Sequence, residues 1–268
     1  MSAVLHAAVT GWGLCAPGLD DAAAFADWLR DPTRALPGGH SARPAAACMA
    51  PAEHRRAPHA VRLALEAATQ ALGTHHATSI GAVFCSAFGD MANTDVILST
   101  LAQTPDQVSP TRFTHSVHNA AAGHWSMAAA SHASMSALAC GREGIGPALL
   151  AALLEVRASA APQLLVLFDA ADAGALADAA PCALDFSVAL LLAPVVDDAS
   201  GPRLHARVQA GHASPNTPCD TRLQPWYAGS PAARALPLLE VCLGAAPRRF
   251  TWPLGSGTLL SLDCEHPP

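Results

Sequence analysis

The sequence predicts an α/β fold in which one mixed β-sheet is flanked by helices. Short apolar segments of strand length alternate with segments whose apolar residues recur at helical spacing. Two strand-like segments, 163–168 and 186–192, are apolar almost throughout, which is typical of strands covered on both faces. The 268 residues are 51% apolar and only 13% charged, so we expect a large core or a buried partner surface.

The N-terminal part begins with a strand, a turn and a helix. Residues 5–10 form a short apolar strand, and an acidic pair then caps an amphipathic helix that contains Phe25 and Trp28. Residues 31–58 are rich in Pro, Gly and Ala without periodicity, which predicts a long surface excursion. The elements predicted after it are a helix at 61–72, a strand at 80–85, helices at 93–101, 120–130 and 145–157, and strands at 163–168, 186–192, 204–210 and 258–263, with an irregular Pro-rich stretch after 211.

Composition excludes several classes of function. All 15 positive charges are Arg, and the absence of Lys excludes Schiff-base chemistry and a phosphate-binding P-loop. The net charge is −6 and the Arg residues are scattered, so a nucleic-acid partner is not expected. No apolar run approaches the roughly 18–20 residues of a membrane span, and no signal peptide is recognised, so a cytoplasmic location is expected. The eight Cys form no C-x-x-C pair and are expected to be mostly reduced and buried.

A histidine cluster is the first candidate for chemistry. His115 and His118 are three residues apart, and His124 follows six residues later. On a helix this spacing would bring two imidazoles to one face, as a metal site requires. No acidic or Cys partner lies near them in sequence, so we expect no metal and instead a role at a helix start or an interface.

Cys140 is the second candidate. It precedes Gly141 and a helix expected from about residue 144, and a helix N-terminus favours a thiolate. A nucleophile also needs an activating base and an oxyanion hole. The alternative is a small buried residue in a tight turn.

The order of these segments resembles the N-terminal half of a β-ketoacyl-ACP synthase. Residues 8–18 are similar to the family's V-T-G-x-G strand and the S-P-x-G turn after it. The further matching segments are 60–72, 80–83, 108–110, 119–123 and 186–192. This resemblance implies a thiolase-like layered fold for residues 1–212, and it leaves 213–268 as a Pro-rich tail with a terminal strand packing on the same domain.

Residues 109–113 and 116–126 resemble, more narrowly, the short ketosynthase-like proteins of aryl polyene gene clusters. Those proteins are regarded as chain-length-factor-like partners of a complete ketosynthase. The resemblance therefore implies a subunit, without a cofactor, that works beside a second chain.

The departures from the family motif concern catalysis. Alignment on Gly141 and the following helix sets residues 137–141 against the family's A-C-x-S-G, so Leu138 occupies the nucleophile position. Family synthases also use two His and a Lys from a second half of the fold, and this chain has no Lys. The resemblance implies that this chain does not condense carbon units by itself.

The expected partner is a catalytic β-ketoacyl-ACP synthase, in a heterodimer or heterotetramer that also meets acyl carrier protein. The chain would limit acyl length in aryl polyene, polyketide-type or fatty-acid-like elongation. The interface and acyl-tunnel residues implied by the resemblance are Arg112, Phe113, His115, His118, Asn119, Trp125, Met135 and Leu138. Two alternatives stay open: an acyltransferase or thioesterase-like half-thiolase that uses Cys140 with His118 or His115 as base, and a stand-alone docking module for acyl carrier protein.

Overall fold

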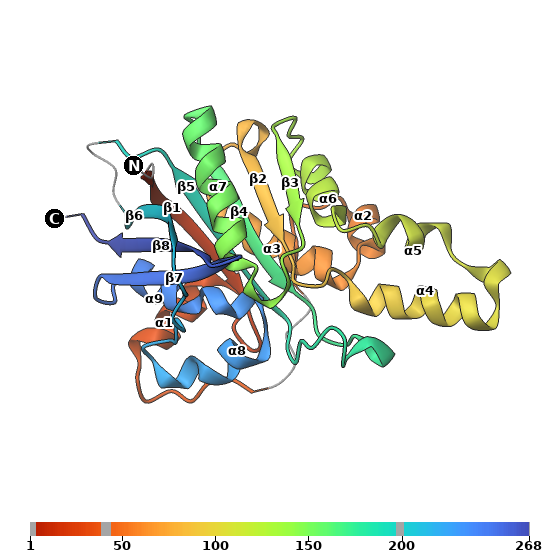
Figure 1. Cartoon of the computed structure of the whole chain (residues 1–268). Helices are drawn as coiled ribbons and strands as arrows, with labels where there is room; N and C mark the ends of the chain where they lie inside the picture. The colour runs from red at the N-terminus through yellow and green to blue at the C-terminus, as the bar shows by residue number, and fades with distance from the viewer. Residues whose placement is uncertain (1–3, 39–43, 197–200, 268) are drawn as a thin grey trace.

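The computed structural model describes residues 4–38, 44–196 and 201–267, which form one mixed sheet with helices on both faces (Figure 1). The strand order across the eight-stranded sheet is β3-β2-β4-β5-β1-β6-β8-β7. The strands are β1 (Leu5–Cys15), β2 (Gly81–Cys85), β3 (Met135–Leu138), β4 (Gln163–Asp169), β5 (Phe186–Ala193), β6 (Arg203–Ala210), β7 (Arg248–Gly255) and β8 (Thr258–Glu265). Strand β2 runs parallel to both β3 and β4, and every other pair in the sheet is antiparallel.

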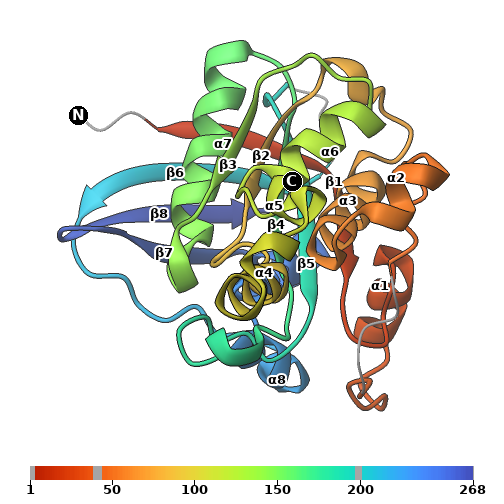
Figure 2. The ribbon, with the colours of Figure 1, turned by 90° about the vertical axis from the view of Figure 1, so that its right-hand side faces the viewer.

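The helices pack on two faces of this sheet. They are α1 (Ala22–Arg30), α2 (Pro51–Arg56), α3 (His59–Leu72), α4 (Met91–Gln103), α5 (Pro110–His115), α6 (Ala120–Ala128), α7 (Ile145–Ser159), α8 (Gln224–Gly229) and α9 (Leu236–Cys242). One hydrophobic cluster joins α3 and α6 to one face, and a second cluster joins α1, α7, α8 and α9 to the other. Figure 2 shows α3 and α7 on opposite sides of the strands. The predicted α/β sandwich is confirmed.

Strand β4 explains why the central strands are apolar almost throughout. All seven of its residues are buried. Leu165 and Leu167 belong to the cluster under α7, whereas Leu164 and Val166 belong to the cluster under α3. Because successive side chains point to opposite faces, a strand covered on both faces needs apolar residues at every position.

The two glycines in the Gly11-Trp12-Gly13 turn motif have a packing role. They lie inside β1, which continues to Cys15, so the strand predicted for residues 5–10 is five residues longer than expected. A Cβ at Gly11 would overlap the backbone carbonyl of Ala71, and a Cβ at Gly13 would overlap that of Ala67. Only glycine therefore lets α3 lie directly against this strand.

The C-terminal residues are more regular than expected. The stretch after residue 211 contains α8, α9 and β7, so the prediction of an irregular tail was wrong there. Strands β8 and β7 extend the sheet beyond β6. Trp226, Leu236 and Phe250 enter the same cluster as α7, so this segment shares one core with the rest of the chain.

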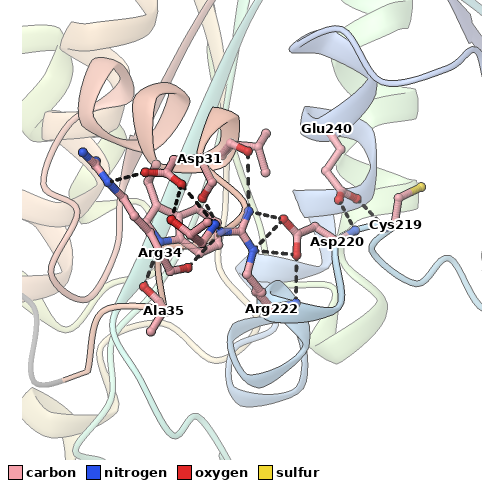
Figure 3. Close-up of polar contacts among 10 residues, drawn as sticks. Asp31, Arg34, Ala35, Cys219, Asp220, Arg222 and Glu240 are labelled. Atoms are coloured by element: carbon pink, nitrogen blue, oxygen red, sulfur yellow. Dashed lines mark hydrogen bonds and ion pairs between the residues drawn. The ribbon is translucent and has the colours of Figure 1, made fainter.

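Arg222 fastens this segment to the N-terminal part (Figure 3). Its guanidinium donates to the backbone carbonyls of Asp31 and Arg34, at 2.8 and 2.9 Å, and forms an ion pair with Asp220. The same group lies over the Trp28 ring, 4.1 Å from its centroid. One planar cation thus joins the α1 region to the tail by hydrogen bonds and by stacking.

None of the helices in the described ranges combines the length and the apolar character that crossing a bilayer requires.

Candidate functional site

The turn between β3 and α7 is where the family motif would place its nucleophile. Leu138 is the last residue of β3, and Cys140 precedes a three-residue 3-10 turn, Gly141–Glu143, before α7 begins at Ile145. Cys140 is therefore more than one turn away from the long helix. The dipole of α7 acts within the first turn of that helix, which does not include Cys140.

The imidazoles of His118 and His115 make contacts that do not involve the Cys140 thiol. His118 donates from Nε2 to the backbone carbonyl of Leu138, at 2.6 Å. The ring of His115 instead packs edge-on against His124, with centroids 5.3 Å apart. Across the described residues, no hydrogen bond joins Cys140 to either His118 or His115. Its thiol lies beside the thiol of Cys85, whose pKa burial raises well above the usual range.

The space beneath the turn is filled. A cavity bordered by Cys85, Gly144 and Asp169 measures only about 10 Å³, and Ala232 of the tail lines it as well. A single water needs roughly 10–15 Å³ of such volume. No acyl chain can enter this space as the structure stands.

Asp169 is a buried acid at the edge of that cavity. Its Oδ1 accepts hydrogen bonds from the Ser86 hydroxyl at 2.9 Å and from the Ala87 backbone N–H at 2.8 Å. Burial raises the pKa of Asp169 to about 7, although these two bonds act in the opposite direction. The residue ties the end of β4 to the loop after β2.

The two edges of the sheet differ in chemistry. Strand β7 carries Arg248, Arg249 and Pro253, and such residues discourage further strand pairing. Strand β3, with the sequence Met-Ser-Ala-Leu, has no charge and no proline, and all four residues are half-buried. Among the strands of the described ranges, β3 pairs with β2 alone, so its other side is an open edge of the sheet.

An apolar arm lies next to the β3 edge. Helices α4 and α5 extend away from this end of the sheet in Figure 1, and in Figure 2 α4 is seen end-on in front of the strands. Phe113 on α5 is 63% exposed, and Met127 on α6 is 62% exposed. Large apolar side chains are exposed along these helices and the loop after α5: Val96, Leu98, Leu101, Phe113, Val117 and Met127. Exposed apolar patches of this kind mark interaction surfaces.

The residues expected at the interface fall into two groups. Exposed at this end are Arg112, Phe113 and Asn119, while Met135 and Leu138 lie half-buried on β3. Arg112 is positioned by Asn93, whose side-chain amide donates to the Arg112 carbonyl at 2.9 Å. The second group consists of His115, His118 and Trp125. The two histidines are half-buried, and Trp125 is buried. Met135 packs against the hydrophobic cluster of α3 and α6, whereas Leu138 packs against that of α7, so the expected residues do not all lie on one face of the sheet.

A larger cavity, of about 670 Å³, lies at the start of α3 and was not foreseen from the sequence. His59 Nε2 contacts Asp185 Oδ2 at 2.8 Å, and Asp185 Oδ1 accepts from the Ala171 N–H, also at 2.8 Å. Cys182 lines the same cavity, but burial raises its pKa to about 11, so its thiol is neutral near pH 7. The His–Asp pair spans 126 residues of sequence, and no local motif marks it.

Residues 26–236 match the family model of the β-ketoacyl synthase N-terminal domain. This chain belongs to that family. The search of curated proteins gave no match.

Solved ketosynthases share its fold. A structure of the ketosynthase ApeO with its chain length factor ApeC, from Xenorhabdus doucetiae, aligns with a TM-score of 0.68 and 22% identity over 97% of this chain and 99% of the other. A complex of a type II polyketide synthase acyl-carrier protein with its ketosynthase, AntDE:AntF, gives 0.72 and 11% identity over 99% and 100%. A β-ketoacyl synthase from Burkholderia phymatum gives 0.57 and 13% over 88% and 71%. The thiolase-like fold is thereby confirmed.

The turn after Leu138 carries a carbonyl-bound imidazole and borders a cavity of about 10 Å³. At the same end of the sheet, the uncharged edge strand β3 is accompanied by exposed apolar side chains on α4, α5 and α6.

Proposed function

We propose that this chain is a ketosynthase-like subunit that does not catalyse condensation and that pairs with a catalytic β-ketoacyl-ACP synthase. The observation that carries the proposal is the Leu138 turn. A leucine has no nucleophile, and the cavity of about 10 Å³ beneath the turn leaves no room for an acyl chain. Acyl carrier protein would be met through the complex, in the cytoplasm.

The β3 edge and the apolar arm are the proposed interface. An obligate interface buries roughly 2,000 Å² or more and is rich in apolar side chains. Phe113 and Met135, from α5 and β3, would lie at its centre. The low charge content of the chain, 13%, suits a surface that is covered in the working complex.

The subunit would limit acyl length by steric means. Side chains from one subunit would close the end of the partner's acyl tunnel, because a chain cannot grow into space already filled at core density. Aryl polyene, polyketide-type and fatty-acid-like elongation are the reactions in which such a limit would act. Two solved complexes that share the fold contain a ketosynthase with a chain length factor or an acyl-carrier protein, which supports this assignment.

The pairing is tested by co-expression with the ketosynthase encoded nearest to this gene, followed by affinity purification and mass photometry. We expect a stoichiometric complex. The Phe113→Asp variant should reduce recovery of the partner at least tenfold, because a charge would be buried in an apolar contact. Leu154→Asp is the matched control, because Leu154 is also an exposed apolar residue, 49% exposed, but lies on α7.

Each other outcome has a defined meaning. If Phe113→Asp and Leu154→Asp recover the partner equally well, the proposed interface is wrong. If the chain stays monomeric and binds acyl carrier protein alone, it is a docking module. If it is acylated at Cys140 by an acyl thioester without a partner, it is an acyltransferase-like enzyme.

A further inference from the structure

A polar cavity of about 380 Å³ lies where the segment after β6 meets α8 and β7. Asn216 holds the wall on the β7 side, because its side-chain amide donates to the Thr251 carbonyl at 2.8 Å and accepts from the Thr251 N–H at 3.2 Å. The backbone N–H of Ser214 adds a bond to Thr251 Oγ1, at 2.9 Å. No lining residue belongs to β3, α4 or α5, so the cavity is independent of the proposed interface.

Arg234 is the lining residue whose hydrogen-bonding capacity is unused. Its guanidinium lies over the Tyr227 ring, 4.7 Å from the centroid, and this contact holds the cation against the cavity wall. Among the described residues, no hydrogen bond or ion pair engages the guanidinium, and none of its nitrogens is sealed from solvent. Arginine has five N–H donors and no acceptor. A ligand in the cavity can therefore reach a half-buried cation that the protein leaves without an acceptor.

Tyr227 supplies a second donor to the same cavity. The residue is only 8% exposed, yet its hydroxyl has no hydrogen-bond partner within the described ranges and is not sealed from solvent. Buried tyrosines usually place the O–H on a partner. One acceptor group in the cavity would supply what both Arg234 and Tyr227 lack.

Charge narrows the chemistry of that acceptor group. The formally charged side chains that line the cavity are Arg234 and Glu143. A planar carboxylate matches the guanidinium fork and carries a single negative charge. A dianion such as inorganic phosphate would bring more negative charge than one cation neutralises, in a cavity that Glu143 also lines. A monoanion therefore fits better than a dianion.

The remaining walls describe the body of the ligand. Trp252, Pro215 and Pro253 line the cavity and offer apolar surface. A cavity of roughly 150 Å³ holds a benzene ring, so 380 Å³ has room for a body of about two rings. We propose that the cavity between α8 and β7 binds a monocarboxylate with an apolar body, whose carboxylate accepts hydrogen bonds from Arg234 and Tyr227.

Isothermal titration calorimetry of the isolated chain with 2-naphthoate tests the proposal. We expect saturable binding. 2-Naphthamide has nearly the same shape but no charge, so it should bind at least tenfold more weakly, because bonds to a charged group are the stronger ones. Inorganic phosphate lacks the apolar body and should also bind more weakly than 2-naphthoate.

Four variants locate the site. Arg234→Gln should remove the preference for 2-naphthoate over 2-naphthamide, and Tyr227→Phe, which keeps the ring under the cation, should weaken 2-naphthoate about fivefold. Glu143→Gln should tighten 2-naphthoate about twofold, because a like charge is removed. Arg248→Gln is the matched control and should change nothing: Arg248 also lies over an aromatic ring, but its guanidinium already donates to the Thr217 carbonyl at 2.7 Å.

Several results would overturn the proposal. They are an absence of saturable 2-naphthoate binding, equal affinities of the wild-type chain for 2-naphthoate and 2-naphthamide, tighter binding of inorganic phosphate than of 2-naphthoate, and equal losses in Arg234→Gln and Arg248→Gln. The wild-type comparisons decide even if a variant fails to fold, and no measurement depends on pairing with a synthase.

Discussion

At the scale of single residues, the contacts of Leu138 and Asp169 describe the chemistry at the turn between β3 and α7. The only polar contact to Leu138 from the histidine cluster is made to its backbone carbonyl, by His118. With Nε2 donating there, Nδ1 is the ring nitrogen that keeps a lone pair, and among the described residues no hydrogen bond joins it to Cys140. Asp169 holds the end of β4 to the loop after β2.

Asp169 makes stability depend on pH. Its folded-state pKa, about 7, lies above the usual value of 3.8, so the folded protein holds this proton more tightly than the unfolded chain does. Its contribution to stability is complete below pH 4 and is lost as the pH rises through 7, by up to roughly 4 kcal/mol at 1.36 kcal/mol per pKa unit.

The Asp169→Asn variant cannot ionise, so its melting temperature should fall less between pH 5 and pH 8.5 than that of the wild type. Thermal unfolding at both pH values measures the difference. Parallel curves for the two proteins would show that the buried carboxyl does not titrate in this range.

At the scale of elements, sequence patterns predicted the segments with a clear apolar pattern and missed those without one. Strands β4 and β5 and helices α3 and α7 were predictable, because burial on several sides demands long apolar runs. Strand β3 has four residues, and β7 contains a proline and two arginines, so neither displays a strand pattern. Helices α8 and α9 are short and begin beside prolines.

Sites depend on contacts that sequence spacing does not encode. The assignment of Leu138 to the nucleophile position stays a prediction, made from a motif that lies within one continuous segment. The His59–Asp185 pair joins residues from α3 and from the residue before β5, and no pattern in either segment signals the other. The histidine cluster gave His124 as a residue of interest, but only packing showed its unpaired nitrogen.

Arg222 strengthens the attachment of the tail, which also shares the hydrophobic core and the sheet. Arg222→Ala removes hydrogen bonds to two carbonyls, an ion pair with Asp220 and a stacking contact with Trp28, and should lower the unfolding free energy by about 2–3 kcal/mol.

Arg222→Lys should not restore the lost unfolding free energy, because an ammonium lacks the planar fork of donors that a guanidinium has. Urea denaturation measures both variants. Arg249→Ala is the control: its ion pair with Asp263 is exposed, so little change is expected. A loss no larger for Arg222→Ala than for this control would contradict the role assigned to Arg222.

At the scale of the whole molecule, one edge strand of the sheet is protected against further strand pairing and the other is not. Arg and Pro residues protect β7, whereas β3 is uncharged and contacts α6, with α4 and α5 extending beyond α6 (Figure 1).

Condensation by the reconstituted complex, with Cys140 replaced, tests this account most directly. Cys140 lies immediately before the 3-10 turn that leads into α7, and Cys140→Ser removes the thiol at this position. The rate at which the purified complex elongates an acyl thioester with malonyl-ACP should stay within about twofold of the wild-type rate, since the partner supplies the nucleophile. A fall of tenfold or more, with the complex still assembled, would show that this chain contributes the reacting sulfur and would contradict the account.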